Sequence, residues 1–444
     1  MLPAPLSERT RGQSPTREAF MTESQYLSES GVPVYAYPNP GLHGFCICLY
    51  LFAGNLYETP EKQGISHFYE HIAPRSLNRR MNGKLYETLD RYGLTLDAAT
   101  SKQTVEFSIS GAVKHFELAA ELITGLFAPL SVTYADAETE KKRIKAEIRE
   151  ENSNSSFFAF TEAEIWKGTP LAGSITGTPG TLNKLRLRDL TDARNTLLSA
   201  NNIFFYLTGN LSEKNIRFLL DRLSRCTIPV TAPKRTNSVP LPKRFLDRER
   251  AVHVKYSETT AVSFTFDIDT ASHSDAERVL LYDILTAGDS GRLYQELSEK
   301  TGYVYSCSPY METYRNCGIY SFSFEVSPPK LLPAVETAVR VFNSLKQDVS
   351  EALPLVRAPY TDNAELLYDS PEDFNWIRAY ECHILDLPYP SVRDRIAAYE
   401  AVSPQRLSEM ARSIFVRSGL TFTLEGNKKK LPVSEIDSIL DHLG

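Results

Sequence analysis

The sequence predicts an α+β protein built from two copies of one domain. The first observation is a repeated segment, since Gly-Lys-Leu-Tyr-Glu-Thr-Leu at 83–89 is matched by Gly-Arg-Leu-Tyr-Gln-Glu-Leu at 291–297. The second is that the same order of strands and helices surrounds both segments. The third is composition, because 42% hydrophobic residues in a chain of 444 are ample for large packed cores. A period of about 208 residues, from Gly83 to Gly291, is too long for a solenoid and indicates duplicated domains.

Each copy is expected to contain a strand, a helix, the repeated segment, two short strands and a second helix. In the first copy, the strands and helices outside the repeated segment are expected at 45–52, 64–72, 94–99, 104–110 and 116–127. Their counterparts in the second copy are expected at 262–268, 275–285, 303–309, 318–326 and 331–345. This order predicts an antiparallel sheet packed against helices in each copy.

Prolines mark the boundary between the copies. Residues 226–250 contain four prolines and several basic residues, a composition typical of a linker. We therefore expect an N-terminal domain at 31–230, a linker at 231–248 and a C-terminal domain at 249–444. The segment 1–30 is predicted to be a disordered tail, because its start is polar and lacks the apolar core of a secretory signal.

Charge, hydropathy and cysteine content limit the classes of protein to which this chain can belong. The net charge of −6 argues against a nucleic-acid binder, which would be basic. The longest apolar run, at 45–53, is far short of the roughly 20 residues needed to span a bilayer, so no membrane anchoring is expected. The six cysteines form no Cys-x-x-Cys pair and are expected to be buried free thiols. Such thiols fit a reducing compartment, and a cytoplasmic location is expected.

The segment His67-Phe68-Tyr69-Glu70-His71 has the spacing of a metal site. On a helix, His67 and His71 project from the same face, as two zinc ligands would. Glu70 lies beside them, within reach of a metal-activated water. This order of residues is the inverzincin signature. The helix expected at 275–285 lacks it, so only the first copy can build such a site.

A catalytic zinc site usually needs a third protein ligand. The segment 135–152 is predicted to be an exposed helix that is rich in glutamate. Spacing alone does not choose between its candidates, which are Glu140, Glu147, Glu150 and Glu151. A single glutamate on such a helix is usually part of a solvated acidic face.

Two adjacent stretches carry a family resemblance. Residues 53–60, Ala-Gly-Asn-Leu-Tyr-Glu-Thr-Pro, and 64–71, Gly-Ile-Ser-His-Phe-Tyr-Glu-His, are similar to the pattern aGsryEtp…GlaHflEH. That pattern belongs to the pitrilysin (insulinase) family of zinc metallopeptidases. The chain resembles its small two-domain subunits, as in mitochondrial processing peptidase and bacterial peptide-maturation peptidases. The resemblance covers nearly the whole chain and implies two homologous domains that form half of a clamshell.

The resemblance also implies roles for particular residues. In the family, the third ligand follows the second histidine by about 76 residues, which is Glu147 here. An acidic residue seven positions earlier, Glu140 here, would orient a ligating histidine. One Zn²⁺ per chain would then be held by His67, His71 and Glu147, with Glu70 as the general base of peptide hydrolysis.

Substrate contacts are also implied. The family binds peptide on an edge strand through an Asn-Ala-x-Thr segment, matched here by Asp97-Ala98-Ala99-Thr100. Ala98 and Ala99 are therefore expected to contact substrate, although Asp97 replaces the family asparagine. The family also uses an Arg and a Tyr of the second domain; Tyr305 is present, but Ser298 stands at the arginine position.

The missing arginine implies a partner. We expect a zinc metalloendopeptidase that cleaves peptides or leader segments inside a chamber. It would be the catalytic subunit of a heterodimer whose sibling supplies the Arg/Tyr pair, with a homodimer as the alternative. The competing interpretation is a non-catalytic scaffold or peptide-binding subunit of a larger processing complex. General peptide turnover and leader-peptide maturation both remain open.

Overall fold

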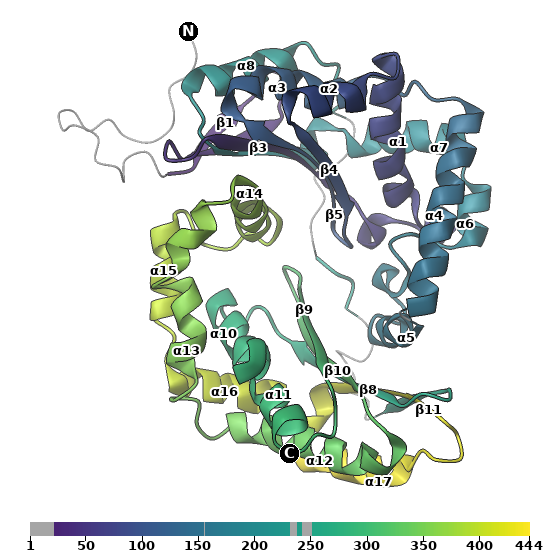
Figure 1. Ribbon diagram of the computed structural model, residues 1–444, viewed down its shortest axis with the longest axis vertical. Helices are drawn as coiled ribbons and strands as arrows, with labels where there is room; N and C mark the ends of the chain where they lie inside the picture. The colour runs from purple at the N-terminus through teal and green to yellow at the C-terminus, as the bar shows by residue number, and fades with distance from the viewer. Residues whose placement is uncertain (1–21, 155, 231–237, 242–250) are drawn as a thin grey trace, which may run out of the picture.

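The first half of the molecule is built on a six-stranded sheet (Figure 1). The computed structural model describes residues 22–154, 156–230, 238–241 and 251–444. The strands lie in the order β1-β2-β6-β3-β5-β4. Their bounds are β1 Ser24–Leu27, β2 Pro33–Pro38, β3 Gly44–Phe52, β4 Thr95–Thr100, β5 Thr104–Ala112 and β6 Ile203–Gly209. Neighbouring strands are antiparallel except β2 and β6, which are parallel.

The second half is built on a five-stranded sheet in the order β7-β11-β8-β10-β9. Its strands are β7 Val252–Tyr256, β8 Ala261–Ile268, β9 Cys307–Thr313, β10 Gly318–Glu325 and β11 Leu420–Gly426. Here β7 and β11 are the parallel pair. The predicted α+β class is confirmed. Each sheet is mixed, with one parallel pair beside the antiparallel pairs that were predicted. The parallel partners are far apart in sequence, and the long connection between them lets both strands run in one direction.

The two sheets have the same topology. The strands β2, β6, β3, β5 and β4 correspond in order to β7, β11, β8, β10 and β9, which confirms the predicted repeat. Strand β1 is extra and pairs Ser24 with Ala36. Part of the segment predicted to be a disordered tail is therefore a strand. Residues 1–21 and most of the predicted linker, at 231–237 and 242–250, lie outside the described residues, so the domain bounds stay predictions.

Helices flank both sheets. In the first half they are α1 Ile65–Arg80, α2 Leu85–Tyr92, α3 Phe116–Thr124, α4 Tyr134–Asn154, α5 Ser156–Ile165, α6 Pro179–Lys184, α7 Leu187–Leu197 and α8 Glu213–Ser224. In the second half they are α10 Asp275–Thr286, α11 Arg292–Tyr294, α12 Leu331–Leu345, α13 Leu353–Arg357, α14 Pro371–Ala379, α15 Val392–Glu400, α16 Pro404–Ile414 and α17 Val433–Leu440. Two π-helical turns, Gln295–Glu299 and Tyr380–Ile384, extend α11 and α14.

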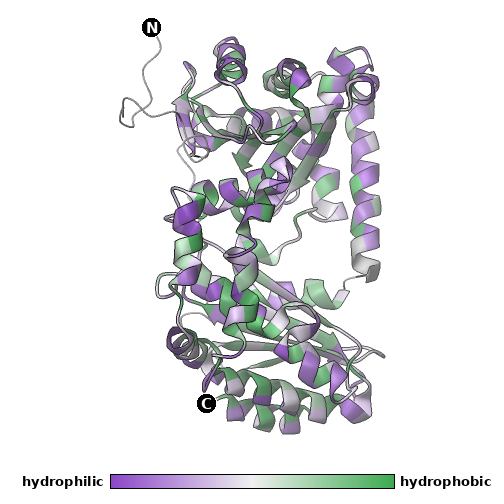
Figure 2. Ribbon diagram, turned by 60° about the vertical axis from the view of Figure 1, so that its left-hand side comes forward, coloured by the Kyte–Doolittle hydropathy of each residue, from purple (hydrophilic) through white to green (hydrophobic). Residues whose placement is uncertain are grey.

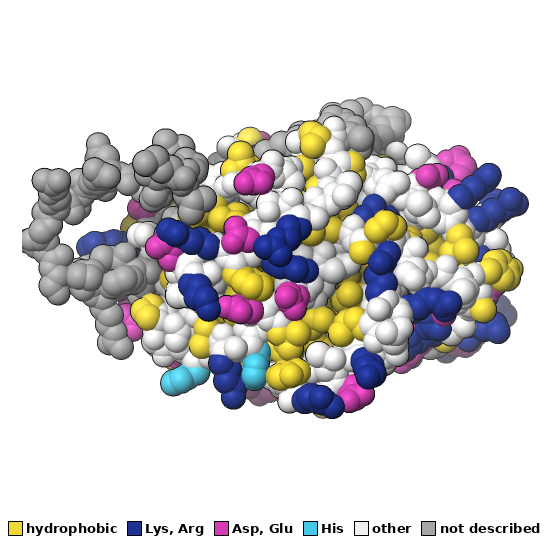
Figure 3. All heavy atoms as spheres, turned by 90° about the horizontal axis from the view of Figure 1, so that it is seen from above, with side chains coloured by type: hydrophobic (Ala, Val, Ile, Leu, Met, Phe, Trp, Pro, Cys, Tyr) yellow, Lys and Arg dark blue, Asp and Glu magenta, His cyan; other side chains and the backbone are white. Residues whose placement is uncertain are grey.

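Each sheet has its own core. Hydrophobic residues concentrate on the strands and on the helix faces turned toward them (Figure 2). Seen from above, the outer face carries basic and acidic side chains interspersed with apolar ones (Figure 3). This arrangement is expected of amphipathic helices that cover a sheet on one side and meet solvent on the other.

One helix of each half packs against the sheet of the other half. Helix α14 of the second half packs on β3 and β6, where Phe374 joins Tyr50 and Tyr206 in a buried cluster. Helix α5 of the first half packs on β8 and β11 of the other sheet. Strand β3 is therefore covered on both faces, which explains its almost uninterrupted apolar sequence. Helices α5 and α14 therefore hold the two halves of the molecule together.

One strand of the repeat lies away from its predicted position. The strand expected at 303–309 is β9, Cys307–Thr313. The backbone N–H groups of Tyr303 and Val304 donate to the carbonyl of Leu297, at 3.0 and 3.1 Å, and close the preceding helical turn. These residues therefore end a helix instead of beginning a strand.

All six cysteines are free thiols, as predicted; three are buried and three are partly buried. Among the described residues, no helix combines the length and apolarity required to cross a bilayer. The cytoplasmic location stays a prediction.

Candidate metal centre

The start of helix α1 is held by glycine geometry and by a carboxylate. Gly64, the residue before the helix, has a φ of 86°. A Cβ at this position would lie 2.7 Å from the carbonyl oxygen of Thr176, so only glycine fits. The Glu58 carboxylate accepts hydrogen bonds from the backbone N–H groups of Gly64 and Ser66, both at 2.8 Å. The helix therefore begins just before His67, and its first turn is firmly anchored.

The two histidines of α1 converge with one glutamate of α4. The Nε2 atoms of His67 and His71 lie 3.8 and 3.4 Å from Oε2 of Glu147. One ligand atom from each of the three residues lies within 4.8 Å of the others. Of the other glutamates considered, Glu150 is exposed, and the side chain of Glu151 lies outside the described residues. Two imidazole nitrogens and a carboxylate are the donor set of a catalytic zinc site, so the residues fit the metal.

A second carboxylate supports His71. Nδ1 of His71 lies 3.3 Å from Oε2 of Glu140, whose side chain is only 2% exposed. Arg75 donates to Glu140 at 2.5 Å and to Asp136 at 3.1 Å. A hydrogen bond at Nδ1 leaves Nε2 facing Glu147, which fixes the orientation a metal ligand needs. The role predicted for Glu140 requires this contact with His71 and stays a prediction.

The ionisation of the group suits its chemistry. Burial, together with the neighbouring His71, lowers the pKa of His67 to about 4, so the ring is neutral at pH 7. Burial raises the pKa of Glu70, and the nearby carboxylates of Glu147 and Asp97 add to this effect. A carboxylate whose pKa is raised is a better proton acceptor. Glu70 lies 3.6 Å from Nε2 of His67 and accepts a hydrogen bond of 3.3 Å from Thr100 Oγ1.

Thr100 ends strand β4, which lies at the edge of the first sheet. One side of β4 pairs with β5, where Ala99 lies opposite Glu106 and Asp97 lies opposite Ser108. The structure thus places the predicted Ala98 and Ala99 on an edge strand whose last residue touches Glu70. A cavity of about 860 Å³ lies between the halves and is lined by Ala99, Thr100 and Glu106 on this side.

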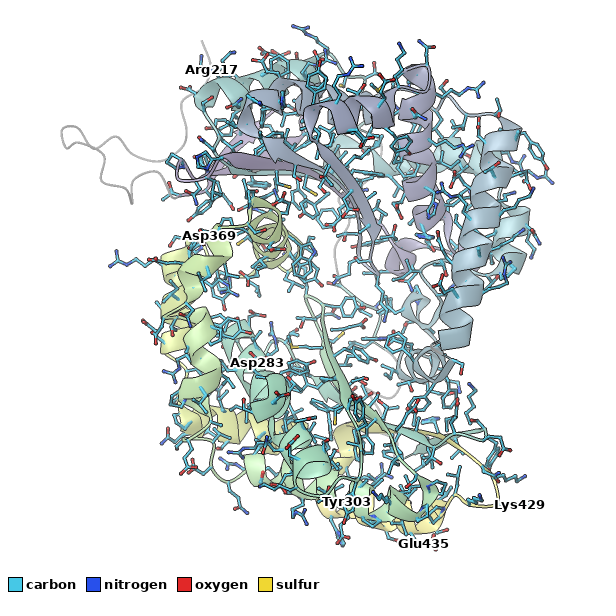
Figure 4. All side chains as sticks on the ribbon, in the orientation of Figure 1. Arg217, Asp283, Tyr303, Asp369, Lys429 and Glu435 are labelled. Carbon is cyan, nitrogen blue, oxygen red and sulfur yellow. The ribbon has the colours of Figure 1, made fainter. Side chains whose placement is uncertain are left out.

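The opposite wall of this cavity belongs to the second half and includes Asp283 and Tyr380. Figure 4 places Asp283 on α10, on the side of the space between the two sheets. The cavity therefore adjoins the edge strand with one wall from each half of the molecule.

The predicted Tyr305 lies apart from this centre. Figure 4 places Tyr303, two residues earlier, at the end of the molecule opposite α1. The Tyr305 side chain is 94% exposed, and its carbonyl accepts a hydrogen bond of 3.3 Å from Ser298 Oγ. Ser298 and Tyr305 therefore adjoin each other, but the chain does not bring them to its own metal group.

Comparisons with known proteins agree with this architecture. The model of the Insulinase (Peptidase family M16) domain matches residues 39–179, and that of the Peptidase M16 inactive domain matches residues 184–353. The chain therefore belongs to peptidase family M16. It is a two-domain member, with the metal group in its first domain.

Several relatives span almost the whole chain. The uncharacterized zinc protease YmxG of Bacillus subtilis is 21% identical over 396 residues, covering 88% of this chain and 95% of that protein. The β subunit of the mitochondrial-processing peptidase of Caenorhabditis elegans is 20% identical over 445 residues, covering 97% of this chain and 95% of that subunit. A protease from Helicobacter pylori shares the fold, with a TM-score of 0.82 and 16% identity over 92% of this chain and all of the other.

Three supporting residues had no predicted role. Arg75 lies four residues after His71 on the same helix face, a spacing that could have revealed it. Glu58 and Thr100 lie within the resembling segments. Glu58 bonds to the start of the next helix, six and eight residues on, whereas Thr100 bonds to Glu70, thirty residues earlier in the chain. Neither contact follows a sequence pattern that would have predicted it.

Proposed function

We propose that this protein is a zinc-dependent endopeptidase. The observation that supports this most strongly is the convergence of His67, His71 and Glu147 within 4.8 Å, with Glu70 beside them. A relative named as a zinc protease spans 88% of the chain, which supports the same assignment.

Each residue of the centre has a distinct task in this proposal. His67, His71 and Glu147 would hold the ion, and Glu140 keeps the His71 ring oriented. When bound, zinc supplies Lewis-acid chemistry, which acidifies water and polarises a carbonyl group. Glu70 takes a proton from water as general base and passes it to the leaving amine. The hydroxyl of Thr100 keeps one Glu70 oxygen in place.

Substrate would bind as an added strand on β4. The free edge of β4 offers backbone groups to an extended peptide, and the small side chains of Ala98 and Ala99 allow close approach. The adjoining cavity of about 860 Å³ gives room for side chains of the peptide. Asp97 adds a negative charge on this strand, where it would tune the choice of peptide.

We propose that a sibling subunit completes the site. Ser298 lacks the charge and the reach of an arginine, and Tyr303, two residues before Tyr305, lies at the end of the molecule opposite α1. The sibling would provide the Arg/Tyr pair and close a chamber around the peptide. Assay of the purified chain alone and with its sibling tests this. We expect little activity alone, and full activity of the lone chain would contradict an obligate heterodimer.

A scaffold role is the alternative. Cytochrome b-c1 complex subunit 1 of Mus musculus is 25% identical over 212 residues, which cover 47% of this chain. A scaffold would not need the four residues of the metal centre. Metal analysis of the purified protein separates the two roles, because a scaffold would hold no stoichiometric zinc.

The deciding experiment compares three single variants. Glu70→Gln should reduce hydrolysis by at least about 10³-fold while one zinc per chain is retained. Glu147→Gln should lose both zinc and activity. Glu150→Gln is the matched control, since Glu150 is exposed on the same helix, and it should keep both. A fall in hydrolysis of less than about tenfold in Glu70→Gln would exclude Glu70 as the base.

A further inference from the structure

The turn at Ser101–Gln103 connects β4 to β5 and lies against the loop that leads into α1. The carbonyls of Lys102 and Gln103 accept hydrogen bonds from the backbone N–H groups of Leu56 and Ala53, at 3.1 and 3.2 Å. The approach is so close that a Cβ at Gly54 would lie 2.2 Å from the Ser101 carbonyl oxygen. The turn is therefore fixed to the segment that precedes the metal-binding helix.

The side chains of the same turn bind the second half. Lys102 Nζ lies 2.7 Å from Glu312 on β9 and also contacts Glu162 on α5. The amide nitrogen of Gln103 donates to the carbonyl of Thr313 at 3.1 Å and to the hydroxyl of Tyr380 at 2.6 Å. Two adjacent residues thus make four polar contacts, three of them with the half that has no metal group.

These contacts are buried, so they constrain the turn strongly. The Lys102 side chain is 13% exposed, and Gln103 is 4% exposed. Burial alone would lower the pKa of Lys102, but the carboxylates of Glu312 and Glu162 outweigh this effect and raise it. A buried ammonium group without those partners would be costly. The turn is therefore held from both sides, by backbone hydrogen bonds within the first half and by buried side-chain contacts with the second.

The residue just before the turn is Thr100, whose hydroxyl donates to Glu70. We propose that Lys102 and Gln103 are positioning residues through which the metal-free half holds both the substrate strand β4 and the general base. This inference rests on the proposed peptidase function. It assigns the second half a part in the reaction even though none of its side chains belongs to the metal group.

The test compares variants at a temperature where all are folded. Lys102→Met should lower kcat about tenfold or more, because small misplacements of catalytic groups have large effects. KM should change less, and one zinc per chain should remain. Lys102→Arg restores the charge and should recover most of kcat. An unchanged kcat in Lys102→Met would overturn the inference.

A second contact between the halves supplies the matched control. Thr161 on α5, the residue before Glu162, shares a buried hydrogen bond of 2.7 Å with Thr423 on β11 of the second half. Thr161→Val should lower stability while leaving kcat unchanged. An equal fall of kcat in both variants would mean that general loosening, and not the turn, is responsible.

Lys102→Met leaves Glu162 and Glu312 without their cation, which lowers the stability of this variant. The double variant Lys102→Met/Glu312→Gln removes one of the two unpaired negative charges, and its kcat and KM are compared with those of the wild type in the same way.

Hydrogen exchange of the backbone amides of residues 95–104 gives a readout that does not depend on activity. Exchange there should quicken in the Lys102 variants but not in Thr161→Val, and unchanged exchange would refute the inference. If the wild type hydrolyses no peptide, the proposed function fails. Hydrogen exchange then still decides whether Lys102 and Gln103 hold β4 in position.

Discussion

At the scale of the residue, Glu106 shows how burial sets charge near the substrate strand. It lies on β5 opposite Ala99, and burial together with the charge of Asp97 raises its pKa to about 7. The group ordinarily titrates near 4.5, so the folded state binds more protons between those two pH values. Folding stability therefore falls as pH rises from about 4.5 through 7.

Glu106→Gln removes this penalty. We expect its free energy of unfolding to exceed that of the wild type by about 1–3 kcal/mol at pH 8, with little difference near pH 4. Chemical denaturation at the two pH values measures this. Glu121→Gln, at an exposed position of α3, should differ from wild type by less than about 0.5 kcal/mol at both. A gain that is the same at pH 4 and pH 8 would contradict the assigned cause.

At the scale of the element, the first turn of α1 depends on a carboxylate from the preceding loop. Glu58 satisfies two backbone N–H groups that the helix itself leaves without partners. These bonds also fix the turn that carries His67. The stability of the helix and the geometry of the metal centre are therefore linked through one residue.

Glu58→Ala should lower the free energy of unfolding by about 1–3 kcal/mol, because two charge-assisted hydrogen bonds are lost. Zinc affinity should fall by about tenfold or more, since the orientation of His67 is loosened. Competition with a chelator measures the affinity, and thermal denaturation measures the stability. Glu61→Ala, an exposed carboxylate in the same loop, should change neither. Unaltered zinc affinity in Glu58→Ala would show that the hydrogen bonds of Glu58 do not control the geometry of the metal centre.

At the scale of the whole molecule, the halves are joined by buried polar contacts as well as by apolar packing. Asn375 on α14 is 1% exposed. Its side chain accepts from the Tyr50 hydroxyl at 3.0 Å and donates to the Tyr206 carbonyl at 2.8 Å. One residue of the second half thus bonds to two strands of the first sheet.

Asn375→Ala should lower the free energy of unfolding by about 2–4 kcal/mol, since it leaves a cavity and unpaired polar groups. Hydrogen exchange in β3 and β6 should quicken although the change lies in the other half. Glu372→Ala, on the exposed side of α14, is the control and should behave as wild type. A variant whose β3 and β6 exchange as in wild type would show that α14 does not stabilise the first sheet.

Features that depend on nearby residues or on a repeated pattern could be predicted from the amino-acid sequence. Helical spacing placed His67, Glu70 and His71 on one face, and the repeat predicted matching strand orders in the two halves. Tertiary structure alone decided that Thr100 bonds to Glu70, that Lys102 joins the metal-free half, and that α14 covers the first sheet. It also decided that residues 303 and 304 close a helix before β9 begins. The physical reason is that spacing along the chain sets which side chains share a face, whereas contacts between distant segments depend on how complete elements pack.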